Sequence, residues 1–336
     1  MHIRLLSLLV AALMMSVAAG SSFAADLTVY SARKEHLIKP LFDAYTARTG
    51  VDIEYITDKA GPLLQRIKAE GKNTRADLLI TVDAGNLWHA ANEGVLQPVD
   101  SRVLTANVPS NLRDAQGRWF GLSLRARTIV YNTDKVKPGE LSTYAALGDD
   151  TWKGRLLLRT SKKVYNQSLV AMMIAEYGAE KTEQIVESWV NNLAAAPFSN
   201  DTKTMQAIAA GQGDVGIVNT YYYGRLKKKD PSLPLALFWP NQGIAGSGVH
   251  VNVSGAGVTK HARHPEAAIA FIEWLSSADA QNLFADINQE YPVNPTVEPS
   301  AEVASWGDFT ASPFDLTRAG ELQGAAIRLM DRVGYR

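Results

Sequence analysis

Strand-like and helix-like segments alternate close to the start of this chain. Residues 26–30 and 76–81 are short β-rich runs, and residues 51–55 alternate apolar with polar side chains, as a half-buried strand does. Between these runs, apolar residues recur at helical spacing over residues 35–50 and 63–71. Parallel strands need a crossover between them, which is usually a helix, so this order predicts a parallel sheet covered by helices. We therefore expect an α/β domain.

A second unit of the same kind follows. Residues 127–132 and 154–159 have the pattern of strands, and residues 168–177 have the pattern of a helix. A short helix at 203–210 and an apolar strand at 214–219 come next. Two α/β units in one chain favour two lobes with a cleft between them, where a small ligand is enclosed from both sides.

The first 24 residues have the pattern of an export signal. Arg4 precedes an apolar run over residues 5–19, and Ser22 and Ala24 place small side chains at the −3 and −1 positions of a cleavage site. The apolar run is shorter than the roughly 20 residues that a bilayer-spanning helix needs. We interpret residues 1–24 as a signal peptide that is cleaved after Ala24. The pattern predicts an exported protein that is not inserted in a membrane.

Composition argues against several classes of function. The chain has 34 Lys plus Arg against 34 Asp plus Glu, and a formal charge of zero argues against nucleic-acid binding by phosphate neutralisation. It has no cysteine, which removes disulfide scaffolds, thiolate metal sites, iron–sulfur clusters and cysteine nucleophiles. The common serine-nucleophile, zinc-protease and phosphate-loop motifs are missing as well. We expect a binding protein with no catalytic residues, and an exported hydrolase stays as the alternative from another class.

Three consecutive tyrosines, Tyr221, Tyr222 and Tyr223, are the most unusual local feature. They stand where the predicted strand at 214–219 enters a helix. A free phenol has a pKa of about 10, so it becomes a phenolate only beside a strong charge such as a trivalent ion. Hard phenolate oxygens suit Fe³⁺. Two interpretations stay open from the residues alone: a mixture of core, interface and exposed rings, or a set of ligands for a hard metal ion.

Three arginines lie in the predicted cleft loops. Arg33 follows the first strand, and Arg125 and Arg127 open the strand that begins the second unit. A guanidinium group suits a carboxylate or a small oxyanion such as carbonate, because its donors form a planar fork. Ordinary ion pairing at the surface is the alternative interpretation.

Five segments together identify a family resemblance: residues 29–35, 124–132, 164–170, 218–222 and 288–294. They resemble the periplasmic ferric-ion-binding proteins of bacterial ABC transporters. The resemblance spans nearly the whole chain after the signal, in order. Its most specific parts are the tyrosine pair that follows Asn-Thr at 219–220 and the Tyr-Asn-Gln-Ser segment at 165–168.

This resemblance implies a type II periplasmic binding fold, which is a two-lobed α/β fold with the ligand in the cleft between the lobes. It implies two crossovers between the lobes, near residues 121–125 and near residues 246–253. The boundaries that it predicts are 25–124 plus 249–299 for the N-terminal lobe and 125–248 plus 300–336 for the C-terminal lobe.

The resemblance also implies that Tyr165, Tyr221 and Tyr222 bind Fe³⁺ as phenolates, with Tyr223 outside the ligand set. Several members of the family place a histidine, or a His-Tyr pair, after the first strand. This sequence has a lysine and Glu35 there, so Glu35 is a weaker candidate for a metal ligand from the first lobe.

Other members of the family use three tyrosines and a carbonate held by arginine, and this sequence is closer to those. Arg33, Arg127 and, more weakly, Arg125 are therefore expected to contact the anion. Tyr30 aligns with a position that is not the usual ligand, and we expect it to pack in the cleft wall.

The function that the resemblance implies is capture of Fe³⁺ in the periplasm, with carbonate as a candidate second anion. The expected partner is an inner-membrane ABC permease, and the protein is expected to be a monomer. Free Fe³⁺ hydrolyses to insoluble oxides at neutral pH, which is the physical reason for a phenolate cage. The same fold with another anionic or organic solute is the alternative within binding proteins.

Overall fold

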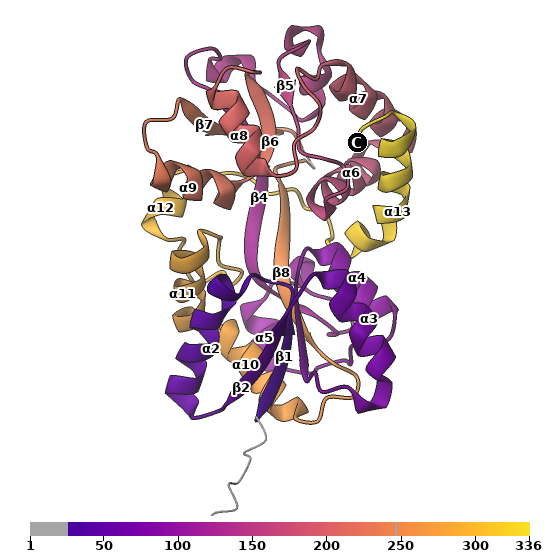
Figure 1. Ribbon diagram of the computed structural model, residues 1–336, viewed down its shortest axis with the longest axis vertical. Coiled ribbons are helices and arrows are strands. Elements are labelled where there is room, and N and C mark those ends of the chain that lie inside the picture. The colour runs from indigo at the N-terminus through magenta and orange to yellow at the C-terminus, as the bar shows by residue number, and fades with distance from the viewer. Residues whose placement is uncertain (1–25, 246) are drawn as a thin grey trace, which may run out of the picture.

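Two long buried strands connect the two lobes of the protein. A computed structural model describes residues 26–245 and 247–336, and it places β4 (Phe120–Asn132) and β8 (His250–Val258) between the lobes (Figure 1). The two strands pair antiparallel along residues 120–127 and 250–256. The two expected crossovers fall on β4 and at the start of β8. The predicted signal peptide, residues 1–24, lies outside the described residues.

One mixed sheet continues through both lobes, in the order β2-β1-β3-β8-β4-β6-β5, and β7 also pairs with β4. The strands of the first lobe are β1 (Leu27–Ser31), β2 (Ile53–Thr57) and β3 (Leu78–Val82). β1 pairs in parallel with both β2 and β3, as the alternation of strands and helices predicts. The strands of the second lobe are β5 (Leu156–Leu157), β6 (Val215–Asn219) and β7 (Leu235–Phe238).

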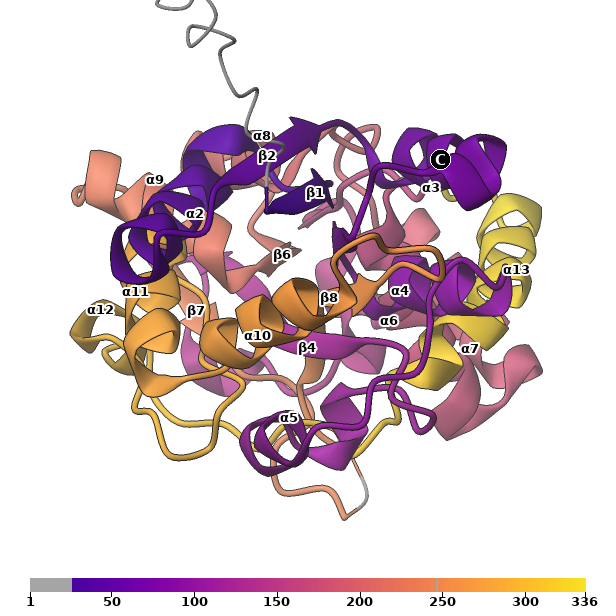
Figure 2. The ribbon, with the colours of Figure 1, turned by 90° about the horizontal axis from the view of Figure 1, so that it is seen from below.

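Helices cover the sheet in each lobe. In the lower lobe of Figure 1 they are α2 (Glu35–Thr49), α3 (Ala60–Glu70), α4 (Ala84–Asn92), α5 (Arg102–Asn107), α10 (Pro265–Leu275) and α11 (Ala278–Asn288). In the upper lobe they are α6 (Val164–Tyr177), α7 (Ala179–Asn191), α8 (Asp201–Ala209), α9 (Thr220–Lys229), α12 (Ala301–Ala304) and α13 (Thr317–Arg332). Figure 2 shows α10 lying along β8, against which it packs. Each helix of the two described ranges falls short of the length and apolarity that a membrane span requires.

Most elements expected from the sequence are present, with shifted ends. The helix expected at 35–50 is α2, which ends at Gly50 in a left-handed conformation, with φ of 77°. The strand expected at 154–159 shrinks to the two residues of β5, and the one expected at 127–132 is the end of the longer β4. Helices α5, α7, α11, α12 and α13 were not predicted from the sequence. The exact lobe boundaries stay a prediction.

The carboxyl ends of the parallel strands point toward the other lobe. In the first lobe β1, β2 and β3 lead directly into α2, α3 and α4, so the starts of these helices lie at the cleft. In the second lobe β6 leads directly into α9. Ligands of open α/β sheets bind at such carboxyl ends, because loops and helix N-termini converge there. The fold therefore places the loop after β1 and the start of α9 at the interlobe cleft.

The helix α13 packs against both lobes, on α6 and on α4 (Figure 1). His89 of α4 contacts Gln323 of α13, with Nε2 2.7 Å from Oε1. Gln323 Nε2 then donates to Oε1 of Gln167 in α6 at 2.7 Å. Gly320 lets α13 approach α4 closely, since a Cβ there would lie 2.5 Å from Trp88. This close packing ties the end of the chain to both lobes.

We predict that Gly320→Ala lowers the free energy of unfolding, measured with urea, by about 1–3 kcal/mol, because the added methyl group overpacks the contact with Trp88. Gly324→Ala is the matched control on the same helix. Its Cβ would meet only the flexible end of Arg328, at 3.4 Å, so it should keep or raise stability by up to about 1 kcal/mol. Equal stability of the two variants would contradict the close packing at Gly320.

Candidate metal centre

The cleft contains a cavity of about 190 Å³. The loop after β1 forms one wall, and the starts of α6 and α9 contribute to the wall opposite. Among the residues that the sequence singled out, those that line the cavity are Arg33, Arg125, Tyr165, Tyr221 and Tyr222. The structure thus brings together three phenols and two guanidinium groups that are far apart in the chain.

Helix starts position the three phenols. Tyr165 is the second residue of α6, and Tyr221 and Tyr222 are the second and third residues of α9. The ring centroids of Tyr221 and Tyr222 lie 4.4 Å apart, and both residues line the cavity. Asn219, the last residue of β6, donates from Nδ2 to the Tyr221 hydroxyl at 3.3 Å. The free N–H groups of a first helical turn give a positive field, which favours an anion such as a phenolate.

The third tyrosine of the run, Tyr223, lies outside the lining of this cavity. Its hydroxyl donates to the carbonyl oxygen of Leu235 at 3.3 Å, and its ring meets Trp306 edge-on, with centroids 6.1 Å apart. The neighbouring Gly224 allows this approach, because a Cβ there would lie 2.6 Å from the Trp306 ring. The side chain of Tyr223 therefore packs from α9 against the segment that follows α12.

Cationic side chains surround the three phenols. Arg125, Arg159 and Lys163 lie near the ring of Tyr165. Arg159 also lies near the ring of Tyr222, and Arg225 lies near the ring of Tyr221. In each case the charged group is 4.9 to 5.8 Å from the ring centroid. A nearby cation lowers the cost of a phenolate. Sequence reasoning missed Arg159, Lys163 and Arg225. Only Arg225 carried a signal, since it stands four residues after Tyr221 on one helix.

Burial dominates the ionisation of these phenols. It raises the pKa of Tyr165 above 10.0, and it raises the pKa of Tyr221 well above that value, with a further increase from the neighbouring Tyr165 and Tyr222. The Arg125 guanidinium opposes this change in pKa at both residues. Near neutral pH, Tyr165 and Tyr221 are therefore protonated in the absence of a bound cation. A metal ion that binds them must displace protons, so acid favours its release.

Arg33 forms a buried ion pair with Glu290 in the wall of the cavity. Its Nη1 and Nη2 each lie 3.2 Å from an oxygen of Glu290, and Nη1 also donates to Ser254 Oγ at 2.6 Å. Burial by itself would raise the pKa of Glu290, but the charges of Arg33 and Arg125 and a hydrogen bond from Ser123 outweigh it and hold that pKa below 4.5. Glu290 lines the cavity beside Arg33. Most of the donors of Arg33 are thus already engaged.

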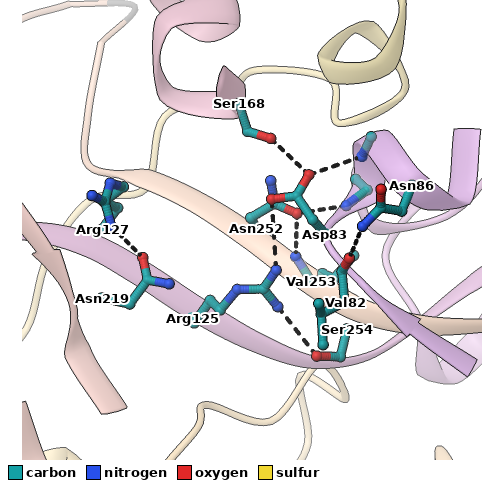
Figure 3. A network of polar contacts seen from close by, with 12 residues as sticks. Val82, Asp83, Asn86, Arg125, Arg127, Ser168, Asn219, Asn252, Val253 and Ser254 are labelled. Carbon is teal, nitrogen blue, oxygen red and sulfur yellow. Dashed lines mark hydrogen bonds and ion pairs between the residues drawn. The ribbon is translucent and has the colours of Figure 1, made fainter. Parts of the chain in front are cut away.

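Arg125 has a donor without a hydrogen-bond partner. Its Nη1 donates to Ser254 Oγ at 3.2 Å, while its Nη2 lies 3.8 Å from Asp83 Oδ2 and has no hydrogen bond (Figure 3). Asp83 caps α4 in a left-handed conformation, with φ of 77°, and its Oδ1 accepts from the Ser168 hydroxyl of α6 at 2.6 Å. Arg125 is therefore the arginine of this cleft best placed to bind an added anion.

Arg127, the third arginine expected to contact an anion, lies outside the lining of this cavity. Its Nη1 lies 3.1 Å from Asn219 Oδ1 and 3.3 Å from Asp201 Oδ2 (Figure 3). Its Nη2 donates to Asn166 Oδ1 and to the carbonyl oxygen of Ile217. The side chain is buried within the second lobe, where these acceptors consume its donors. The expected contact of Arg127 with an anion stays a prediction.

Two further residues lie away from the cavity. Glu35 is exposed, and its Oε1 accepts a hydrogen bond from the Tyr55 hydroxyl at 2.7 Å. Tyr30 is fully buried and donates to Glu70 Oε1 at 2.9 Å, so it does not form the cleft wall. Lys34, next to Glu35, lines the cavity instead. Glu35 therefore lies outside the lining of this cavity, and its role as a metal ligand stays a prediction.

A metal ion in this cavity would depend on the phenol oxygens. Across the described ranges, 26–245 and 247–336, no three His, Cys, Asp or Glu side chains gather as a metal site of those residues would need. Three tyrosine oxygens offer a hard, anionic donor set once deprotonated, which suits Fe³⁺ better than softer ions. The arrangement can therefore hold a hard trivalent ion together with an anion near Arg125.

Comparisons with known proteins bear out the family resemblance. Residues 40–311 match the family model described as bacterial extracellular solute-binding protein. Iron uptake protein A1 of Synechocystis sp. is 43% identical over 317 residues, which cover 93% of this chain and 88% of that protein. The structure of IdiA (FutA) of Trichodesmium in complex with iron and citrate superposes with a TM-score of 0.88 at 42% identity, covering 92% of this chain and 99% of the other.

The apo ferric ion-binding protein A of Pasteurella haemolytica gives a TM-score of 0.87 at 36% identity, over 93% of this chain and 98% of that one. With the Trichodesmium protein it confirms the two-lobed fold that the family resemblance implied.

The contribution of the buried ion pair between Arg33 and Glu290 to the stability of the protein can be tested. Glu290→Gln leaves the guanidinium of Arg33 buried without a counter-charge, and we expect it to lower the free energy of unfolding at pH 7 by roughly 3–5 kcal/mol. The exposed Glu321→Gln is the control and should change little. Because the folded-state pKa of Glu290 lies below 4.5, its contribution is complete above that pH and is lost as acid protonates it. A wild-type advantage over Glu290→Gln that stayed constant into strong acid would contradict the ion pair.

Proposed function

Because this chain belongs to the bacterial extracellular solute-binding protein family, we propose that it captures Fe³⁺ in the cleft between its lobes and delivers it to an inner-membrane ABC permease. The observation that carries the proposal is the convergence of Tyr165, Tyr221 and Tyr222 on one cavity. The iron uptake and ferric-ion-binding proteins among its relatives support the same cargo. The predicted signal peptide supports a periplasmic location.

The three phenols would bind the ion as phenolates. Fe³⁺ carries enough charge to displace the phenol protons, and the resulting oxygens offset most of that charge. The cations around the rings, Arg125, Arg159, Lys163 and Arg225, lower the cost of forming the anions. The protein needs no chemistry on its cargo. Its role is to keep the ion from hydrolysing and to release it to a partner.

A small anion such as carbonate would complete the coordination of the ion. Three phenolates would leave positions on Fe³⁺ open. Arg125 lines the cavity, and its buried Nη2 has no hydrogen-bond partner. Arg33 also lines the cavity, but its terminal nitrogens already hold Glu290, so we assign it the lesser part in binding the anion. The alternative cargo, an anionic or organic solute without iron, would use the same arginines while the tyrosines only stacked on it.

The proposal is tested by adding Fe³⁺ and bicarbonate to the purified metal-free protein and recording the visible spectrum. Coordination by phenolates should give a charge-transfer band and a coloured protein, whereas an organic solute bound without iron gives none. A protein that stays colourless and retains no iron after dialysis would overturn the proposed function.

The tyrosine run supplies matched variants. We expect Tyr221→Phe or Tyr222→Phe to raise the dissociation constant of Fe³⁺ by at least about a hundredfold, or about 3 kcal/mol, and to shift the band, because each removes one coordinating oxygen. Tyr223→Phe removes only the hydrogen bond to Leu235 and should change iron affinity by less than about threefold. If Tyr223→Phe proved the damaging change, the assignment of ligands within the run would be wrong.

A further inference from the structure

Asp83 forms hydrogen bonds in both lobes at the point where they meet. It follows β3, and it is fully buried. Within the first lobe its Oδ1 accepts from the backbone N–H of Gly85 at 3.0 Å, which caps the start of α4. The same oxygen accepts from the Ser168 hydroxyl of α6, in the second lobe, at 2.6 Å (Figure 3). Helix capping accounts for the first of these contacts but not for the second.

The backbone of Asp83 is held in a conformation that residues other than glycine rarely adopt, with φ of 77° and ψ of 128°. Two hydrogen bonds to the connecting strand β8 hold it there. The N–H of Asp83 donates to the carbonyl oxygen of Val253 at 2.9 Å, and the N–H of Ala84 donates to Asn252 Oδ1 at 2.8 Å. A strained residue persists only where its surroundings fix it, and such residues gather at functional sites. The strand that joins the lobes therefore fixes the backbone from which the Asp83 carboxylate extends.

Ser168 connects this contact to the phenols. It stands three residues after Tyr165 on α6, so the two side chains are neighbours on one side of the helix. Tyr221 and Tyr222 are positioned differently, because β6 leads directly into α9. A loop over residues 158–163 precedes α6, and the start of this helix has no side-chain cap. The position of Tyr165 relative to the other two phenols therefore depends on how α6 is held.

Arg125 provides a second link between Asp83 and Tyr165. Its Nη2 lies 3.8 Å from Asp83 Oδ2, and its guanidinium carbon lies 5.3 Å from the centroid of the Tyr165 ring. All three residues line one small enclosed space beside β8. Asp83 is thus linked to Tyr165 by two routes, one through Ser168 and α6 and the other through Arg125.

We propose that Asp83 is a positioning residue of the metal centre: its hydrogen bond to Ser168 holds α6 against the first lobe and thereby sets Tyr165 at the distance from Tyr221 and Tyr222 that a shared metal ion requires. This inference rests on the proposed function. Asp83 acts through Ser168 and is not itself a ligand. Three ligands that all belong to the second lobe then reach their binding geometry only when the first lobe is in contact with α6.

A double-mutant cycle tests this role, because it shows through which ligand Ser168 acts. The dissociation constant of Fe³⁺ supplied with bicarbonate is measured for Ser168→Ala, which removes the hydroxyl and leaves Tyr165 in the chain. We expect this constant to rise about tenfold in the wild-type background and in a Tyr222→Phe background, but less than twofold in a Tyr165→Phe background. Ser188→Ala is the matched control. The Ser188 hydroxyl donates to the carbonyl oxygen of Gln184 within α7, so its loss should change iron affinity by less than twofold.

The visible spectrum gives a second readout. A displaced Tyr165 phenolate should shift the charge-transfer band of Ser168→Ala, whereas a loss of stability alone leaves the band where it is. Urea unfolding of each metal-free variant checks that the affinities are measured on folded protein.

The remaining outcomes decide against the inference. If Ser168→Ala changes neither the iron affinity nor the band, the contact with Asp83 does not position a ligand. A rise of the same size in all three backgrounds also overturns the inference, because Ser168 would then act on the fold as a whole and not through Tyr165. A wild-type protein that binds no iron refutes the proposed function itself, and the inference fails with it.

Discussion

The arrangement of this cleft depends on the free-energy cost of burying charged side chains away from water. A buried guanidinium group is tolerated only when hydrogen bonds and an opposite charge replace the lost water. Arg33 meets this condition through Glu290, and Arg127 and Arg159 meet it by sharing Asp201, which lies 3.3 Å from each. Arg125 meets it only in part, since Asp83 lies 3.8 Å away. The guanidinium groups of Arg33 and Arg127 are thus closely paired with carboxylates, whereas that of Arg125 is paired only at long range.

The same principle connects the tyrosines to their surroundings. Without cargo, the buried phenols are neutral and need no counter-charge. Their conversion to phenolates would add negative charge among several cationic side chains. If the proposed site is right, the cleft would have two states of charge balance, one with protons on the phenols and one with a metal ion in their place.

Sequence reasoning succeeded where a property is local. The strand-helix order predicted the parallel first lobe, and the tyrosine run at the start of α9 pointed to two residues that do line the cavity. It failed where the property depends on distant partners. Glu290 lies within a segment that carried the resemblance, but its importance arises from Arg33, 257 residues away. Nothing near Arg127 in the sequence reveals Asp201 and Asn219 as its partners.

The continuous sheet has a mechanical consequence. The lobes are connected by more than flexible loops. Between them, β4 and β8 are paired antiparallel along residues 120–127 and 250–256. Any change in the angle between the lobes must bend or twist this two-stranded ribbon, which resists deformation elastically. The connection therefore resists a change in the angle between the lobes, which a flexible loop would not do. Any opening or closing of the lobes around a cargo would therefore have to work against this resistance.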